Sequence, residues 1–246
     1  IRPTHGRLDL SGMMPQAPSS DTAGWFAREA TVFEQVSRVV LGERVRRSAG
    51  HLLVAVDAFG IADPETAAAL KPAVDRLATL VGSRRDETMA PQGLSVWARA
   101  QRTLQPWEGW LTFKDWLDEL NPRMAYSVAR NLALASMIPE SERQWAEMMR
   151  LDARARVNFL LDEGTVLCMP TTPFPAPPKG LSVSAQTPLR NRIACLCSHG
   201  GLTGVCQVNV PAAEVDGRPV GLSIVGRAGA DAMIVELAVA LAGELK

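Results

Sequence analysis

Two apolar runs of strand length constrain the fold of this chain more than any other feature. Residues 51–59 are almost entirely apolar and are bounded by Gly50 and Gly60, and residues 165–169 form a second run that ends at Pro170. Side chains of a strand alternate between the two faces of a sheet, so a strand that is apolar throughout must be covered on both faces. The sequence therefore predicts a sheet enclosed between layers of helices.

Helical patterns surround these runs. Apolar spacing and start signals predict helices over residues 32–40, 63–81, 121–135, 139–161, 190–197 and 230–245. The second of them starts with Asp-Pro-Glu, which is typical of an N-cap, a first-turn proline and an early acidic residue. Pro72 is expected to kink or split this helix, and Pro106 to separate two helical pieces.

The remaining strands are expected mainly near the C-terminus. Residues 205–210 and 221–225 are strand-like, and the Asp-Gly pair between them favours a hairpin turn. Residues 7–10 alternate like a short strand, whereas residues 84–87 are all charged and indicate a solvated segment. Strands that alternate with helices predict an α/β fold, a mixed β-sheet flanked by helices.

One domain is expected to span residues 1–246. Residues 84–135 are interpreted as a helical, tryptophan-rich insertion or cover within it, because four tryptophans gather there: Trp97, Trp107, Trp110 and Trp116. These rings could stack bases or sugars, but no basic patch is interleaved with them, which favours core packing.

Charge and hydropathy exclude several classes of function. The 26 basic side chains are balanced by 26 acidic ones, so neither a nucleic-acid surface nor an anionic-membrane surface is expected. No apolar run reaches the roughly 18–20 residues that a membrane span needs. Four cysteines are too few for a disulfide scaffold and favour a reducing, cytoplasmic setting.

The sequence Cys195-x-Cys197-x-His199 is the most tempting local cluster for a metal. Structural zinc sites usually have a fourth ligand and wider spacing, and residues two apart on a helix point in different directions. We interpret these cysteines as core residues and predict neither a metal site nor a cofactor. A cysteine nucleophile paired with His5, His51 or His199 stays an alternative that no local motif supports.

A glycine-rich stretch, Gly200-Gly201-x-x-Gly204, is a weak candidate for a phosphate site. These glycines are expected to follow a helix rather than to open one, so no helix N-terminus would face an anion there. A closely packed loop is the better interpretation. The residues taken alone identify no reaction.

Three longer segments resemble the amidase signature family. The first combines Arg-Pro-Thr-His-Gly-Arg at residues 2–7 with Gly-Met-Met-Pro at 12–15 and Ser-Asp-Thr-Ala-Gly-Trp-Phe-Ala-Arg at 20–28. The second is Cys-Met-Pro-Thr-Thr-Pro-Phe-Pro-Ala-Pro at 168–177. The third pairs Val-Asn-Val-Pro at 208–211 with Gly-Arg-Pro-Val-Gly-Leu-Ser-Ile-Val-Gly at 217–226. Their order and separation match the family, and residues 21–27 look most like its indole-3-acetamide hydrolase group.

The resemblance implies a serine hydrolase that converts a carboxylic amide, here an aryl-acetamide, to the acid and ammonia. The family uses a Ser–cis-Ser–Lys triad, in which the lysine acts as base through the middle serine and an acyl-enzyme forms. Those residues precede the Arg-Pro-Thr phrase, which here begins at Arg2, and no Gly-Gly-Ser stretch follows. We therefore expect the catalytic residues upstream of Ile1, none of them in this chain, and a chain that is inactive alone. The α/β/α fold would then be incomplete, since its N-terminal part is absent.

The expected contribution of this chain is sheet strands and pocket walls. Candidate pocket residues are Asp21, Thr22, Trp25, Thr171 and Thr172. The first two could instead cap the helix that follows, and the threonine hydroxyls could bind substrate or only satisfy the backbone of the proline-rich loop. Trp25, with the neighbouring Phe26, could line an aryl pocket or pack in the core.

Two other functions stay open. A truncated, non-catalytic interaction protein would explain the missing triad, and an amidotransferase A-subunit relative would act on charged tRNA with partner subunits. Apart from a small-molecule amide, the expected partners include neither nucleic acid nor membrane, and a homodimer is a further expectation.

Overall fold

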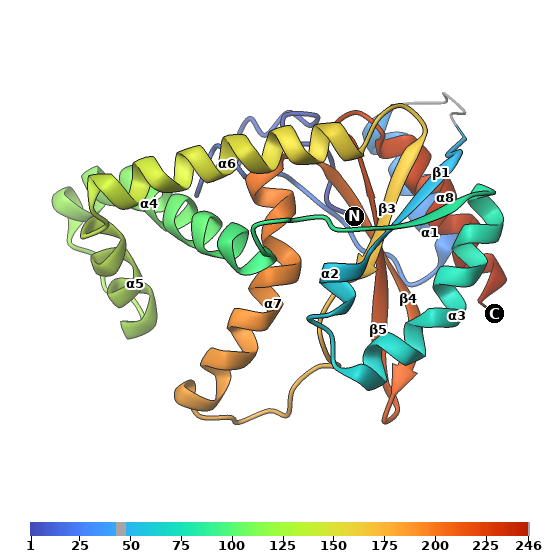
Figure 1. Cartoon of the computed structure of the whole chain (residues 1–246). Coiled ribbons are helices and arrows are strands. Elements are labelled where there is room, and N and C mark those ends of the chain that lie inside the picture. The colour runs from blue at the N-terminus through green and yellow to red at the C-terminus, as the bar shows by residue number, and fades with distance from the viewer. Residues whose placement is uncertain (43–47, 246) are drawn as a thin grey trace.

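A mixed five-stranded sheet forms the centre of the computed structural model, which describes residues 1–42 and 48–245 (Figure 1). The strands are β1 (His51–Ala55), β2 (Arg84–Glu87), β3 (Thr165–Pro170), β4 (Cys206–Val215) and β5 (Arg218–Gly226). Their order across the sheet is β2-β1-β3-β5-β4. β1 is parallel to both β2 and β3, whereas β5 is antiparallel to β3 and β4. The predicted mixed sheet is confirmed.

β3 lies at the centre and is buried along its whole length. Val166 and Cys168 belong to one hydrophobic cluster, and Leu167 and Met169 belong to the other. This alternation is the period of two that a strand imposes on its side chains. Each face of the strand therefore joins a different helical layer to the sheet.

The helices cover both faces of the sheet (Figure 1). They are α1 (Ala30–Leu41), α2 (Val56–Phe59), α3 (Pro64–Val81), α4 (Leu94–Leu120), α5 (Tyr126–Ser136), α6 (Glu140–Leu160), α7 (Val183–Thr203) and α8 (Asp231–Glu244). α1, α3 and α8 share one core cluster, and α4, α6 and α7 share the other. α5 packs on α4 and extends away from the sheet.

The first apolar run is shorter as a strand than the sequence predicts. β1 ends at Ala55, and the next four residues form one turn of helix, α2. The Asp57 carboxylate accepts hydrogen bonds from the backbone N–H groups of Met89 (2.9 Å) and Ala90 (2.8 Å), which ties this turn to the segment before α4. A short apolar run does not by itself distinguish a strand from a buried helical turn.

Three prolines lie inside continuous helices. Pro72 is within α3 and Pro106 is within α4, so the expected division at Pro106 is wrong, and of the two outcomes expected at Pro72 the split is wrong. A proline removes one helical hydrogen bond, but packing on both sides of it offsets this loss: Leu70 and Leu77 of α3 are fully buried. Pro188 is likewise inside α7, which is longer at both ends than the predicted 190–197.

The charged segment 84–87 is a strand rather than a solvated link. It forms β2, pairs in parallel with β1 at the edge of the sheet, and its side chains are largely exposed. The predicted helical insertion therefore begins with a strand of the main sheet, and its helices are α4 and α5. The predicted strand at 7–10 is wrong, because the N-terminal pairing is a single bridge between Arg2 and Gln207.

The hairpin is confirmed, with β4 and β5 joined by Asp216 and Gly217. Both turn residues have positive φ, 51° and 69°, as a tight turn with the twist of a hairpin requires. β4 is the other edge strand and contains Pro211, next to a register shift between Pro211 and Ala213. A proline is tolerated in an edge strand when its nitrogen faces outward.

Among the helices of the described residues, none combines the length and apolarity that a membrane span requires.

The core predicts a large difference between two leucines of one helix. Leu70 of α3 is fully buried, whereas Leu80 is 39% exposed. Leu70→Ala should lower the free energy of unfolding by about 2–5 kcal/mol, because a cavity replaces the lost methyl groups. Leu80→Ala should cost less than about 1 kcal/mol. Urea denaturation of the two variants tests this, and equal losses would contradict the assigned core.

Candidate substrate-binding site

The N-terminal segment is fixed beside β4 by a buried carboxylate. Asp231, the first residue of α8, accepts hydrogen bonds from the Thr4 backbone N–H and from the Thr4 hydroxyl, both at 2.7 Å. The same hydroxyl accepts from the N–H of Gly229 (2.9 Å). A carboxylate is favourable at a helix N-terminus. Because Thr4 is held there, Arg2 lies beside β4, where its backbone pairs with that of Gln207 through two hydrogen bonds of 2.8 Å.

The Arg2 guanidinium lies between this strand pairing and the loop at residues 16–21. Its Nη2 donates to the Ser20 carbonyl at 3.0 Å, and its buried Nε has no hydrogen-bond partner in the described part of the chain. Burial lowers the pKa of Arg2, and the nearby Asp21 carboxylate opposes this by raising it. A Cβ atom on Gly200 would lie 2.8 Å from the Arg2 Cδ, so the glycine leaves room for this side chain.

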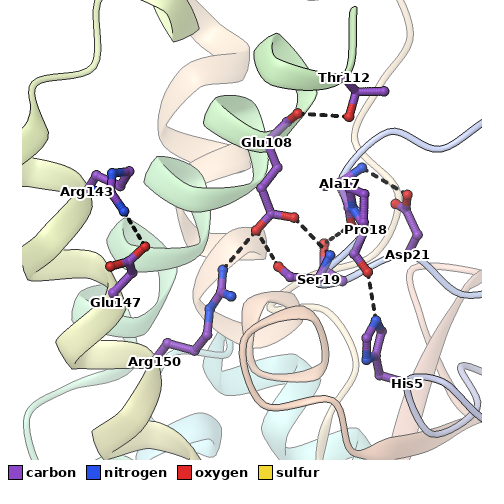
Figure 2. A network of polar contacts seen from close by, with 11 residues as sticks. His5, Ala17, Pro18, Ser19, Asp21, Glu108, Thr112, Arg143, Glu147 and Arg150 are labelled. Carbon is purple, nitrogen blue, oxygen red and sulfur yellow. Dashed lines mark hydrogen bonds and ion pairs between the residues drawn. The ribbon is translucent and has the colours of Figure 1, made fainter.

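The loop at residues 16–21 is held from two sides (Figure 2). Its Ser19 donates from both the backbone N–H (2.9 Å) and the hydroxyl to Glu108 of α4, which also accepts from Arg150 of α6 at 3.2 Å. On the other side, the His5 ring Nε2 lies 2.8 Å from the Pro18 carbonyl oxygen. The loop therefore connects the N-terminal segment with the helical layer.

Four polar side chains from β4, β5 and the residue after β3 form a continuous chain of hydrogen bonds, and we call these residues the polar strip: Gln207, Ser223, Thr171 and Asn209. Gln207 Nε2 donates to Ser223 Oγ (2.7 Å), Thr171 Oγ1 lies 2.7 Å from Ser223 Oγ, and the same Thr171 hydroxyl lies 2.6 Å from Asn209 Oδ1. A Cβ on Gly221 would lie 1.9 Å from Asn209 Oδ1, so only glycine fits beneath this contact.

Asp21 organises the loop rather than a helix. Its carboxylate Oδ2 accepts from the backbone N–H groups of Gln16 (2.8 Å) and Ala17 (2.9 Å). α1 begins only at Ala30, and no side chain caps it, so the expectation that Asp21 and Thr22 cap the following helix is wrong. Thr22 is half-buried, and its side chain makes no hydrogen bond among the described residues.

Trp25 is partly packed against the core, and its Nε1 donates to Ser37 Oγ at 3.1 Å. Its neighbour Phe26 is fully exposed. Both line a cavity of about 180 Å³ beside β4 that also includes Asn209 of the polar strip. Trp25 therefore serves both as core and as cavity wall, whereas Phe26 only lines the cavity.

The two threonines have different surroundings. The Thr172 hydroxyl donates to the Phe174 carbonyl at 2.9 Å and thereby satisfies its own loop. Thr171 instead belongs to the polar strip, and its backbone N–H donates to the Gly221 carbonyl at 2.9 Å. Thr171 is linked to the N-terminal segment only indirectly, because Ser223 connects it to Gln207, whose backbone pairs with Arg2.

Sequence reasoning did not select Arg2, Gln207, Asn209 or Ser223 as site residues. A signal was present in β4, where Gln207 and Asn209 are polar positions that alternate with buried Cys206, Val208 and Val210. Ser223 is a fully buried polar residue in an apolar strand, and only its partners explain it.

The cysteines show no sign of nucleophile activation. Burial raises the pKa of Cys168 and of Cys206 to about 12, and it also raises the pKa of Cys195 and of Cys197. A reactive thiol needs the opposite shift. In the described part of the chain, no three His, Cys, Asp or Glu side chains lie close enough together to hold a metal ion.

Gly200 and Gly201 are inside α7, so the expectation that they follow the helix is wrong for these two, whereas Gly204 follows the helix as its C-cap with a φ of 81°. The close packing is confirmed: a Cβ on Gly201 would lie 2.6 Å from Gln101 Nε2 of α4. Of the four tryptophans in residues 84–135, Trp97 is buried in the core, as core packing predicts, whereas Trp116 is 44% exposed.

A sequence profile described as Amidase matches residues 96–235. This match covers more than half of the chain, which therefore belongs to the amidase family.

Relatives align along nearly the whole chain. Amidase 1 of Arabidopsis thaliana is 24% identical over 273 residues, covering 98% of this chain and 64% of that protein. The "Translocon at the outer membrane of chloroplasts 64" of Pisum sativum is 25% identical over 263 residues, covering 96% of this chain and 44% of that protein. The chain thus spans about half to two thirds of the length of these relatives.

Solved structures show the same fold. A crystal structure of an amidase superposes with a TM-score of 0.83 at 24% identity, covering all of this chain and 58% of that one. The 6-aminohexanoate cyclic dimer hydrolase complexed with substrate superposes with a TM-score of 0.76 at 17% identity, covering 99% and 60%. The described α/β architecture is thus part of the amidase fold.

His199 predicts an acid-dependent loss of stability. This residue is fully buried in α7, its Nε2 has no hydrogen-bond partner among residues 1–42 and 48–245, and burial lowers its pKa to about 4 from 6.5. The unfolded chain therefore binds more protons at this residue between those pH values, and the contribution of neutral His199 to stability is lost as pH falls through that window. The loss should be about 3 kcal/mol.

Urea denaturation at pH 7 and pH 4.5 measures this effect. His199→Gln removes the titrating group, so the variant should lose less stability between the two pH values than the parent chain. An equal loss in both proteins would show that other groups cause the acid sensitivity.

Proposed function

We propose that this chain is the C-terminal portion of a serine amidase that hydrolyses a linear carboxylic amide to the acid and ammonia. The observation that carries the proposal is that three family-like segments, far apart in sequence, meet at one place. Arg2 pairs with Gln207, and Thr171 is hydrogen-bonded to Ser223 and Asn209. In this proposal the chain supplies strands of the sheet and one wall of the substrate pocket.

The catalytic serine and lysine are proposed to come from residues outside this chain. Ser223 has Gln207 and Thr171 as hydrogen-bond partners, and neither side chain is a base. A serine needs an adjacent base to become a nucleophile. Ser223 is therefore not proposed as the nucleophile, and in this proposal the chain alone does not hydrolyse amides.

An aryl-acetamide is the proposed substrate class. Support comes from the aromatic wall formed by Trp25 and Phe26 in the cavity that reaches Asn209. Aromatic side chains bind planar apolar groups well, and Asn209 could orient an amide by hydrogen bonding. A cytoplasmic location is part of the same proposal and rests on the low cysteine content.

The first experiment reads the coding sequence upstream of Ile1, in frame, and expresses the longer protein. Ammonia release from phenylacetamide, indole-3-acetamide and hexanamide is then measured for the longer protein and for the 246-residue chain. We expect activity in the longer protein, with both aryl-acetamides preferred over hexanamide, and none in the chain. An upstream region without a lysine and a Gly/Ser-rich stretch would refute the proposed amidase.

Thr171 and Thr172 provide a matched pair of variants in the longer protein. Thr171→Val should raise KM and lower kcat/KM by about tenfold, because it removes the hydroxyl that bonds Asn209 Oδ1 and leaves Ser223 with Gln207 as its remaining partner in the polar strip. Thr172→Val loses only a bond within its own loop and should change kcat/KM much less. Steady-state kinetics on the preferred amide measure both, and equal effects would remove Thr171 from the pocket wall.

A non-catalytic interaction protein is the second candidate. It is favoured by the relative whose name describes a chloroplast translocon component, which aligns with 96% of this chain. The same ammonia assay separates the two: a correctly folded longer protein that releases no ammonia from any amide would favour this candidate.

A further inference from the structure

A cavity of about 880 Å³ lies between α4 and α5, away from the polar strip. Its apolar walls include Phe113 and Trp116 of α4 and Val128 and Leu132 of α5. The volume is within the range of about 300–1,000 Å³ that is typical of small-molecule sites.

The aromatic wall contains two rings in contact and is accessible to solvent. The rings of Phe113 and Trp116 are in edge contact, with centroids 6.3 Å apart and an interplanar angle of 64°. Trp116 is nevertheless 44% exposed, and Val128, which faces the cavity from α5, is 48% exposed. A planar or branched apolar group could therefore bury against these side chains without displacing others.

Arg102 is the only charged side chain among the described residues that line this cavity. Its Nη1 donates to the Asn191 side-chain oxygen, a neutral partner, and no carboxylate of the described residues forms an ion pair with it. The other polar lining residues are the amides Gln16, Gln105 and Asn131. The cavity thus combines an apolar body with one uncompensated positive charge at its edge.

We propose that the cavity between α4 and α5 binds a small amphiphilic anion, an aryl or alkyl group that carries one carboxylate or sulfonate. The apolar body packs against Trp116 and Val128, and the anionic end accepts hydrogen bonds from Arg102. A charge-assisted bond to a guanidinium is stronger than one between neutral groups, so the anion selects the orientation of the ligand. This site rests on the cavity itself and not on the amidase reaction.

The test uses two dyes with one scaffold in the 246-residue chain. 8-Anilinonaphthalene-1-sulfonate carries the anion, and N-phenyl-1-naphthylamine is its neutral counterpart. Fluorescence titration should show saturable binding of both. Arg102→Gln should weaken binding of the sulfonate by about tenfold and leave the neutral dye unchanged, because only the charge-assisted bond is lost.

Two further variants separate this cavity from other apolar surface. Val128→Trp should obstruct the cavity and weaken binding of both dyes by about tenfold, with circular dichroism confirming the fold. Phe159→Ala, at an exposed aromatic residue of α6 that does not line the cavity, should leave both dissociation constants unchanged. The proposal is overturned if Arg102→Gln leaves sulfonate binding intact, if Val128→Trp leaves both dissociation constants unchanged, or if Phe159→Ala abolishes the signal.

Discussion

β3 has backbone partners along both edges and apolar neighbours on both faces. The edge contacts position the neighbouring strands, and the contacts on the two faces position the helices. It is parallel to β1 on one edge and antiparallel to β5 on the other. Its alternating side chains belong to two separate core clusters, so the helices on the two faces are aligned through one strand. Since the chain leaves β3 directly into Thr171, the position of the polar strip depends on this burial.

Local signals in the sequence were sufficient to predict an element where the residues of that one segment carry the whole pattern. The 165–169 run, the hairpin at Asp216-Gly217 and the start of α3 at Pro64 were predicted because their residues match strand, turn and helix-start chemistry directly. β2 was missed because four charged residues have little intrinsic preference for a strand, and pairing with β1 outweighs that. The continuity of α3 through Pro72 likewise depends on packing from outside the helix.

The candidate site was predictable only in part, because its contacts also depend on residues outside each local segment. Thr171 and Asp21 stand in recognisable segments, but their partners come from other strands and loops. Asn209 and Ser223 meet Thr171 only after β3, β5 and β4 are assembled in register. Similarly, the role of Asp231 as the anchor of Thr4 joins residues 227 positions apart, which no local pattern indicates.

The two edges of the sheet are protected by different chemistry. β2 is short and consists of four charged residues, whereas β4 has ten residues and carries Pro211. Gln207 donates its backbone N–H outward to Arg2, and this direction repeats every second residue, so the proline nitrogen also faces outward and offers no donor. The two arginines and two acidic residues of β2 carry no net charge, so this edge is protected by the hydration that four charged side chains would lose on pairing, not by charge repulsion. A strand that added at β2 would have to displace that water, whereas one that added at Pro211 would lack a hydrogen-bond donor. Neither barrier is an ionic repulsion, so added salt would not remove either of them.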